Sequence, residues 1–218
     1  MPGQRQRPDA SRIDPLLGWL PSDRSWAPSV RYLMRRQRVL ALLSSQPPGA
    51  LLEVGCGAGS LMVELAAQGH RCTGLESSAD ARHLARHLLE QSPARDVAIE
   101  SAEDPVGWRA RFDTLVALDV LEHVEDDLAA LKQWVSWLAP EGVMLISVPA
   151  HSRRWGNGDV WAGHYRRYDR QPLLEVIRAA GLRIAHLECY GFPFANLSEW
   201  FGERHYRKAL HKRAEQGA

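Results

Sequence analysis

Two kinds of hydrophobic pattern alternate along this chain. Short apolar runs bounded by turn residues predict buried strands, and longer segments with apolar positions three and four residues apart predict amphipathic helices. The predicted strands cover residues 50–54, 71–76, 96–100, 113–119, 142–148 and about 182–190. The predicted helices cover residues 28–45, 59–68, 78–91, 125–138 and about 171–180. This alternation indicates βαβ units, so we expect an α/β fold with a doubly wound, mostly parallel sheet between two layers of helices.

The two ends of the chain depart from this central pattern. Residues 1–27 are polar and contain several Arg and Pro, apart from a short apolar piece at 16–20, and are expected to form a flexible arm. Residues 28–218 are expected to form one domain, with an N-terminal helix at 28–48, a core at 49–149 and a lid with the C-terminal segment at 150–218. No alternating run follows Tyr190, so we expect either that the chain ends on a helix in place of a further strand or that it is a shortened version of a longer protein.

Composition narrows the classes of protein. With 218 residues, of which 45% are hydrophobic and 24% charged, the chain suits one well-packed globular domain. A formal net charge of +1 argues against a dedicated nucleic-acid binder. Three widely spaced cysteines without a C-x-x-C pair predict neither a disulfide framework nor a zinc cluster, so the expected compartment is the cytoplasm. The basic segment 203–213 is predicted to be a packed helix with a solvated end, the alternative being contact with an anionic membrane.

A glycine-rich segment carries most of the functional information. The run Glu53-Val54-Gly55-Cys56-Gly57-Ala58-Gly59-Ser60 follows a predicted strand and opens a predicted helix. Glycines allow a tight turn and let main-chain N–H groups approach a polar ligand at the helix N-terminus. A dinucleotide fingerprint, G-x-G-x-x-G, would need glycine where this chain has Ser60. The loop therefore indicates a nucleoside-type cofactor, and the segments after it decide which one.

Acidic residues follow the second and third predicted strands. Glu76 closes the second strand, 21 positions after Gly55. A carboxylate there can accept hydrogen bonds from both hydroxyls of a ribose. The alternative for Glu76 is an acid favoured by the N-terminus of the next helix. After the third strand, Ala102 and Glu103 are placed to flank an adenine and accept from its exocyclic amine, the alternative being a solvated turn.

The fourth predicted strand adds Asp113 and the run Leu118-Asp119-Val120-Leu121-Glu122-His123. With the E-x-G-x-G-x-G loop, Glu76 and the turn at 101–104, this pattern resembles the class I S-adenosylmethionine-dependent methyltransferases, in the small-molecule branch that includes quinone-biosynthesis enzymes. The resemblance implies a Rossmann-like sheet that binds S-adenosylmethionine, with Asp119 and its neighbours at the methionine end. The cofactor-binding residues implied are Glu53, Gly55, Cys56, Gly57, Gly59, Glu76, Ser77, Ala102, Glu103, Asp119 and Val120.

A second signature lies between the fifth strand and the next helix. The run Gly163-His164-Tyr165-Arg166-Arg167-Tyr168 resembles a G-H-x-R-R-Y element found in a subset of these methyltransferases. Its titratable ring, guanidinium groups and phenols suit recognition of an anionic or hydroxylated acceptor. The alternative is a structural lid in which the arginines bind acidic side chains and helix-end carbonyls. The predicted substrate-binding residues are His151, Asp159, Tyr165, Arg167 and Tyr168.

Histidines are the candidate catalytic residues. Methyl transfer from a sulfonium needs positioning, exclusion of water and, for a hydroxyl acceptor, a base. His123 and His164 are the predicted bases because imidazole titrates near neutral pH; a structural role for His123 is the alternative. No metal-ligand cluster is apparent, so no metal is expected. The predicted activity is methylation of oxygen or nitrogen on a small molecule, in the biosynthesis of a metabolite, a quinone or a glycan- or lipid-linked compound.

Two other classes of function stay open. One is a nicotinamide-dependent oxidoreductase on a similar sheet, which Ser60 and the E-x-G-x-G-x-G form of the loop disfavour. The other is a binding module that keeps the cofactor fold without catalysis, because fold does not imply function.

Overall fold

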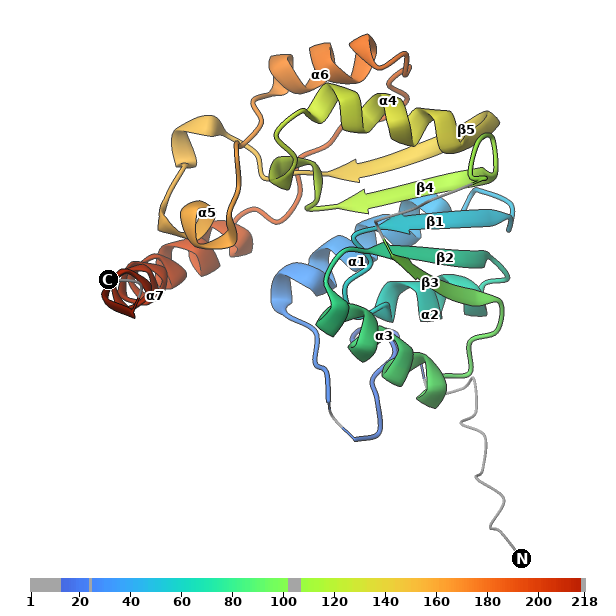
Figure 1. Ribbon diagram of the computed structural model, residues 1–218, viewed down its shortest axis with the longest axis horizontal. Helices are drawn as coiled ribbons and strands as arrows, with labels where there is room; N and C mark the ends of the chain where they lie inside the picture. Colours follow the sequence, from blue (N-terminus) through green and yellow to red (C-terminus); the bar gives the residue numbers. More distant parts are fainter. Residues whose placement is uncertain (1–12, 24, 102–106, 217–218) are drawn as a thin grey trace, which may run out of the picture. The chain divides into compact units, whose positions relative to one another are not determined.

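The computed structural model describes residues 13–23, 25–101 and 107–216. Five strands form one sheet in the order β3-β2-β1-β4-β5 (Figure 1). The strands are β1 (Ala50–Val54), β2 (Arg71–Glu76), β3 (Val97–Ser101), β4 (Phe112–Leu118) and β5 (Leu138–Ser147). The helices are α1 (Val30–Leu43), α2 (Ser60–Ala67), α3 (Ala79–Gln91), α4 (Asp127–Trp137), α5 (Asn157–Ala162), α6 (Arg170–Ala179) and α7 (Phe194–Gln216).

The sheet is parallel and is flanked by helices, which confirms the predicted Rossmann-like α/β fold. β1 pairs in parallel with β2 on one side and β4 on the other, with Leu52 facing Thr73 and Leu115. Leu51, Leu52 and Leu115 are fully buried, as a strand covered on both faces requires. The strand order reverses beside β1, and in parallel sheets ligands bind at the carboxyl ends of the strands near such a reversal. The loop after β1 is therefore the first place to look for a ligand.

The chain divides into two compact units, Met1–Ala117 with Trp137–Leu145, and Leu118–Ser136 with Ile146–Ala218. In the first unit, α2 and α3 pack against β2 and β3. Side-chain caps begin two of its helices, because the Ser29 hydroxyl accepts from Tyr32 N–H at α1 and the Ser78 hydroxyl accepts from Ala81 N–H at α3. These helices thus begin within one or two residues of their predicted starts.

The segment before α1 is packed in its described part, in contrast to the flexible arm expected from sequence. Trp19 is 3% exposed and packs in a cluster with Val63 and Leu88. On α1, Arg36 forms a buried ion pair with Glu64 and also donates to the carbonyls of Pro15 and Leu16. Burial of one large aromatic ring and satisfaction of two carbonyls stabilise the packing of residues 13–23.

The second unit contains the segment after β4 and the C-terminal third of the chain. A short 3₁₀ helix at Leu121–His123 leads into α4. Helix α5, which the sequence analysis did not predict, packs against α7, with the rings of Trp161 and Tyr206 centred 5.2 Å apart. The expected C-terminal helix is present as α7, whose ribbon is red in Figure 1.

The predicted strand at 182–190 is wrong. These residues follow α6 without forming a strand, and most of their side chains are exposed. Alternating apolar positions stabilise a strand only when a neighbouring strand supplies hydrogen bonds and a packing face, which this segment lacks within the described part of the chain. In the described ranges, none of the helices combines the length and apolar character required to cross a membrane.

Candidate active site

The loop after β1 depends on its glycines. Gly55, Gly57 and Gly59 have φ angles of +68°, +53° and +72°, a region that residues with a side chain rarely adopt. Gly55 N–H donates to Leu75 O at 2.7 Å, which fixes the start of the loop to the end of β2. Gly59 then caps α2, so the loop and the N-terminus of that helix form one rigid turn.

Glu76 faces this loop from the end of β2. One of its carboxylate oxygens accepts Gly57 N–H at 2.9 Å and the other accepts Ser78 N–H at 2.8 Å. A carboxylate has about four acceptor positions, so two main-chain bonds orient Glu76 and leave capacity for further donors. The predicted neighbour Ser77 lies in the same turn, between Glu76 and the cap of α3.

This part of the first unit fits a nucleoside cofactor. A Cβ built on Gly57 meets nothing within 4 Å, so the loop presents bare backbone to open space. Glu76, oriented by two main-chain N–H groups, supplies an acceptor beside that space. The cradle therefore has room at the backbone and a carboxylate suited to a ribose, and contact of these residues with the cofactor stays a prediction.

Two further residues at the start of the loop, Glu53 and Cys56, are buried. Glu53 is 5% exposed, and burial raises its pKa to about 8, with the charge of Glu76 adding to the rise. Cys56 packs against Gly74 of β2, where an added Cβ would lie 2.6 Å from the Cys56 sulfur. Sequence reasoning missed Gly74; its only signal was a glycine inside a predicted strand, which marks close approach of another group.

The remaining predicted cofactor residues lie elsewhere. Ala102 and Glu103 fall outside the described residues. Asp119 and Val120 follow β4 in the second unit, where Asp119 has a φ of +54°. Its N–H donates to Ser147 O, and its carboxylate accepts the Ser147 hydroxyl, both at 2.9 Å. Contacts of these residues with a cofactor stay predictions.

In the second unit, a buried carboxylate organises the G-H-x-R-R-Y element. Asp159 of α5 is 1% exposed and accepts from His164 Nδ1 at 2.9 Å, Arg167 Nε at 2.8 Å and Gly156 N–H at 2.9 Å. Burial alone would raise the pKa of Asp159, but these hydrogen bonds hold it below its ordinary value. An ionised Asp159 accepts only, so His164 carries its proton on Nδ1 and its Nε2 is the free acceptor of the ring.

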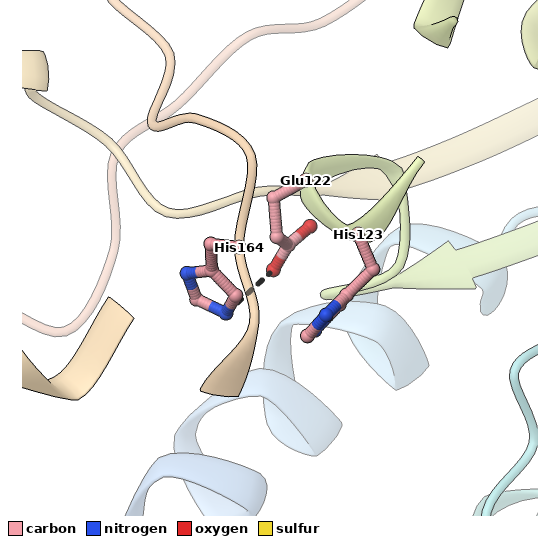
Figure 2. A group of neighbouring side chains, drawn as sticks. All are labelled: Glu122, His123 and His164. Atoms are coloured by element: carbon pink, nitrogen blue, oxygen red, sulfur yellow. Dashed lines mark ion pairs between the residues drawn. The ribbon is translucent and has the colours of Figure 1, made fainter. Parts of the chain in front are cut away.

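The two predicted bases lie side by side. The rings of His123 and His164 are centred 4.6 Å apart in an edge-to-face arrangement. Glu122, fully buried on the same 3₁₀ helix as His123, places Oε1 4.0 Å from His164 Nε2 (Figure 2). Partial burial lowers the pKa of His123, and the neighbouring His164 adds to this effect. The fold thus groups three side chains that could hold a metal ion, whereas no such cluster was apparent from the sequence.

The other predicted acceptor residues also lie in the second unit. Tyr168 is buried and its hydroxyl donates to Asp127 at 2.9 Å, while Tyr165 is 54% exposed. His151 is exposed, and its N–H donates to Tyr168 O at 3.0 Å. Burial raises the pKa of Tyr168, and its bond to Asp127 adds to the rise. Arg167 pairs with Asp159, as the structural alternative expected. Contact with an acceptor stays a prediction for all five residues.

Sequence reasoning missed two acidic residues of this region. Glu122 stands beside His123 in the motif but received no role, and Asp127 pairs with Arg166 at 3.0 Å. An acid next to a candidate base was the available signal for Glu122. Asp127 gave no signal, because it is the third acid of the run 125–127 and acids are ordinary at the start of a helix.

Comparison with known proteins agrees with this geometry. Residues 26–187 match the model of the methyltransferase domain family. The ubiquinone biosynthesis O-methyltransferase of Xanthomonas campestris is 36% identical over 103 residues, 46% of this chain and 43% of that protein. The enzyme of the same description from Idiomarina loihiensis is 34% identical over 119 residues, 52% of this chain and 48% of that protein. The chain thus spans about half the length of the curated relatives it matches.

A solved structure with a similar fold is magnesium protoporphyrin IX methyltransferase from Synechocystis PCC 6803 with bound S-adenosylhomocysteine. It has a TM-score of 0.59 and 19% identity, covering 73% of this chain and 77% of its own, so it supports the fold alone. The family match covers most of this chain. The chain therefore belongs to the methyltransferase domain family, one of the class I S-adenosylmethionine-dependent methyltransferases.

Proposed function

We propose that this protein methylates a hydroxyl group of a small, hydroxylated acceptor in a biosynthetic pathway, with methylation of nitrogen as the nearest variant. The Asp159–His164 pair carries the proposal, because a carboxylate that holds Nδ1–H leaves Nε2 ready to accept a hydroxyl proton. Relatives that are 34–36% identical over about half of the chain act as ubiquinone biosynthesis O-methyltransferases, which also favours oxygen. A dinucleotide oxidoreductase is set aside by the family match and by Ser60.

In this proposal the first unit holds the cofactor and the second serves the acceptor. S-adenosylmethionine, when bound, supplies the methyl group and the sulfur that leaves. Glu76 and the glycine loop hold the ribose and orient the nucleoside. His164, whose Nδ1 is held by Asp159, would take the proton of the acceptor hydroxyl on Nε2. Arg167, itself fixed on Asp159, keeps that carboxylate ionised throughout.

The test is methyl transfer by the full chain to matched acceptors. Purified protein is incubated with methyl-labelled S-adenosylmethionine and with catechols, hydroxybenzoates, prenylated hydroquinols and the corresponding amines, and products are identified by mass spectrometry. We expect O-methylated product from a hydroxylated acceptor. His164→Ala should lower turnover about 100- to 10,000-fold at unchanged affinity for S-adenosylhomocysteine, whereas the exposed His186→Ala should not. Methylation confined to amines, or full turnover of His164→Ala, would contradict the proposal.

A further inference from the structure

The grouping of Glu122, His123 and His164 has the composition of a metal site. One ligand atom from each residue lies within 4.8 Å of the other two. Glu122 is fully buried, and the side chain of His164 is 11% exposed, so two of the three groups are largely shielded from water. Figure 2 shows the two elements that supply them, the 3₁₀ helix with Glu122 and His123 and the loop with His164. His164 lies 41 positions after His123, so the fold brings it to the adjacent pair Glu122 and His123.

The two elements are held together beside the cluster. Tyr165 N–H, next to His164, donates to the main-chain oxygen of Glu122 at 2.8 Å. Arg166 donates to Val124 O at 3.1 Å and pairs with Asp127 at 3.0 Å. The backbone that carries the three candidate ligands is therefore fixed without help from the ligands themselves. A preorganised site of this kind loses little conformational entropy when a ligand binds.

The surroundings of His164 supply the second requirement of a metal site. A metal-binding histidine usually donates its other ring N–H to a carboxylate, which fixes the tautomer and makes the ligating nitrogen more basic. Asp159 does this for His164, and Asp159 is fixed in turn by Arg167 and by Gly156 N–H. His164 Nε2 then faces Glu122 at 4.0 Å. A tetrahedral site needs ligand atoms about 3.3 Å apart, a difference that small side-chain rotations cover.

We propose that Glu122, His123 and His164 bind a divalent transition-metal ion, with zinc as the best fit. Two imidazoles and one carboxylate form a ligand set found in zinc sites that keep a fourth position open for water or substrate. Imidazole ligands favour zinc, cobalt or nickel over magnesium, which prefers oxygen. His123 lies at the surface, so the open position can face solvent.

The role of a bound metal ion in catalysis rests on the proposed function, whereas metal binding itself does not. A cation here would supply positive charge to an acceptor hydroxyl and make it more acidic, in place of the imidazole. Glu122, His123 and His164 would then position that charge. The acceptor class is narrowed to molecules that carry a hydroxyl or carboxylate able to reach a cation.

Zinc binding by the full, untagged chain tests the proposal directly. Protein stripped with a chelator is titrated with Zn²⁺ in competition with a chromophoric chelator, and with Co²⁺ while visible absorption is recorded. We expect one Zn²⁺ per chain, and a visible absorption spectrum that indicates a low coordination number for the bound Co²⁺. Glu122→Gln and His123→Gln should weaken zinc binding at least about tenfold, and Asp159→Asn about 10- to 100-fold. His186→Gln, a change at an exposed histidine of the same unit, should bind as the wild type.

Thermal unfolding of each variant shows whether it is folded. His123→Gln is the decisive variant, because His123 lies at the surface and its replacement should leave the fold intact. Absence of stoichiometric zinc in the wild type, or wild-type affinity in folded His123→Gln, would overturn the proposal. Zinc binding without methylation of any acceptor would support the metal site and contradict the proposed function. Full methylation by a zinc-free chain that does not bind zinc would do the reverse.

Discussion

Replacing Glu76 by Ala tests the cofactor half of the site most sharply. In the structure the Glu76 carboxylate accepts two main-chain N–H groups, from Gly57 and Ser78. If it also accepts the ribose hydroxyls, its removal deletes hydrogen bonds to a charged group, each worth about 1.5–3 kcal/mol. Even one such bond corresponds to about 10- to 150-fold weaker binding of S-adenosylhomocysteine. Glu76→Gln, which keeps one oxygen, should lose less.

Loss of affinity alone would not distinguish contact with the ribose from collapse of the loop, because Gly57 N–H also loses its acceptor. Isothermal titration calorimetry with S-adenosylhomocysteine and with its 2′,3′-dideoxy analogue separates these effects. We expect Glu76→Ala to weaken the parent compound by the full amount and the dideoxy analogue by little. Asp80→Asn, in the first turn of α3, is the matched control for a general charge effect at that helix. Equal losses for both ligands, or unchanged affinity, would refute the ribose assignment.

Three further predictions concern buried groups and the glycine loop. Because folding must protonate Glu53, whose pKa is about 8 in the folded chain and 4.5 in its ordinary state, wild-type stability should fall as pH rises between these values. The gain in Tm from Glu53→Gln should grow from pH 5 to pH 8, and a pH-independent difference would contradict this. Arg36→Met leaves the Glu64 carboxylate buried without its partner and should cost about 3–5 kcal/mol in urea unfolding, against almost nothing for the exposed Arg95→Met; equal effects would refute it. Gly57→Ala should cost about 1–2 kcal/mol of stability and also weaken S-adenosylhomocysteine, whereas Gly107→Ala, at a φ of +79° with equally open surroundings, should affect stability alone.

The order of strands and helices was predictable because local pattern and topology agree. The apolar run of β1 is buried on both faces, and Leu51 and Leu52 are fully inaccessible, so the hydrophobic pattern translates directly into structure. The pattern fails where burial depends on a partner far away. Residues 182–190 alternate like a strand but pair with no strand among the described residues. Arg36 looks like a surface residue in the sequence, but it is buried in an ion pair with Glu64. Neither partner can be read from positions close in sequence.

The functional residues divide in the same way. Gly55, Gly57 and Gly59 were predictable because their role is conformational. Their positive φ angles favour glycine, and the regular spacing of these glycines is visible in the sequence. The grouping of Glu122 with His123 and His164 was not predictable, because two single histidines 41 positions apart carry no spacing signal. Asp159 was placed with the acceptor by its position near His164, whereas the structure gives it a further role that sequence did not suggest. It binds His164 and Arg167 together.

That double role of Asp159 limits what the acceptor region can tolerate. Asp159 is buried, and its ionised form is stabilised by Arg167, by Gly156 N–H and by His164, which all donate to it. Loss of Arg167 would leave a buried carboxylate with weaker compensation, and Asp159 would then tend to take a proton. A protonated Asp159 could hold either tautomer of His164, so Nε2 would no longer be fixed as an acceptor or as a metal ligand. Arg167 therefore acts on the chemistry through Asp159, as a positioning residue, whether His164 holds a proton or a cation.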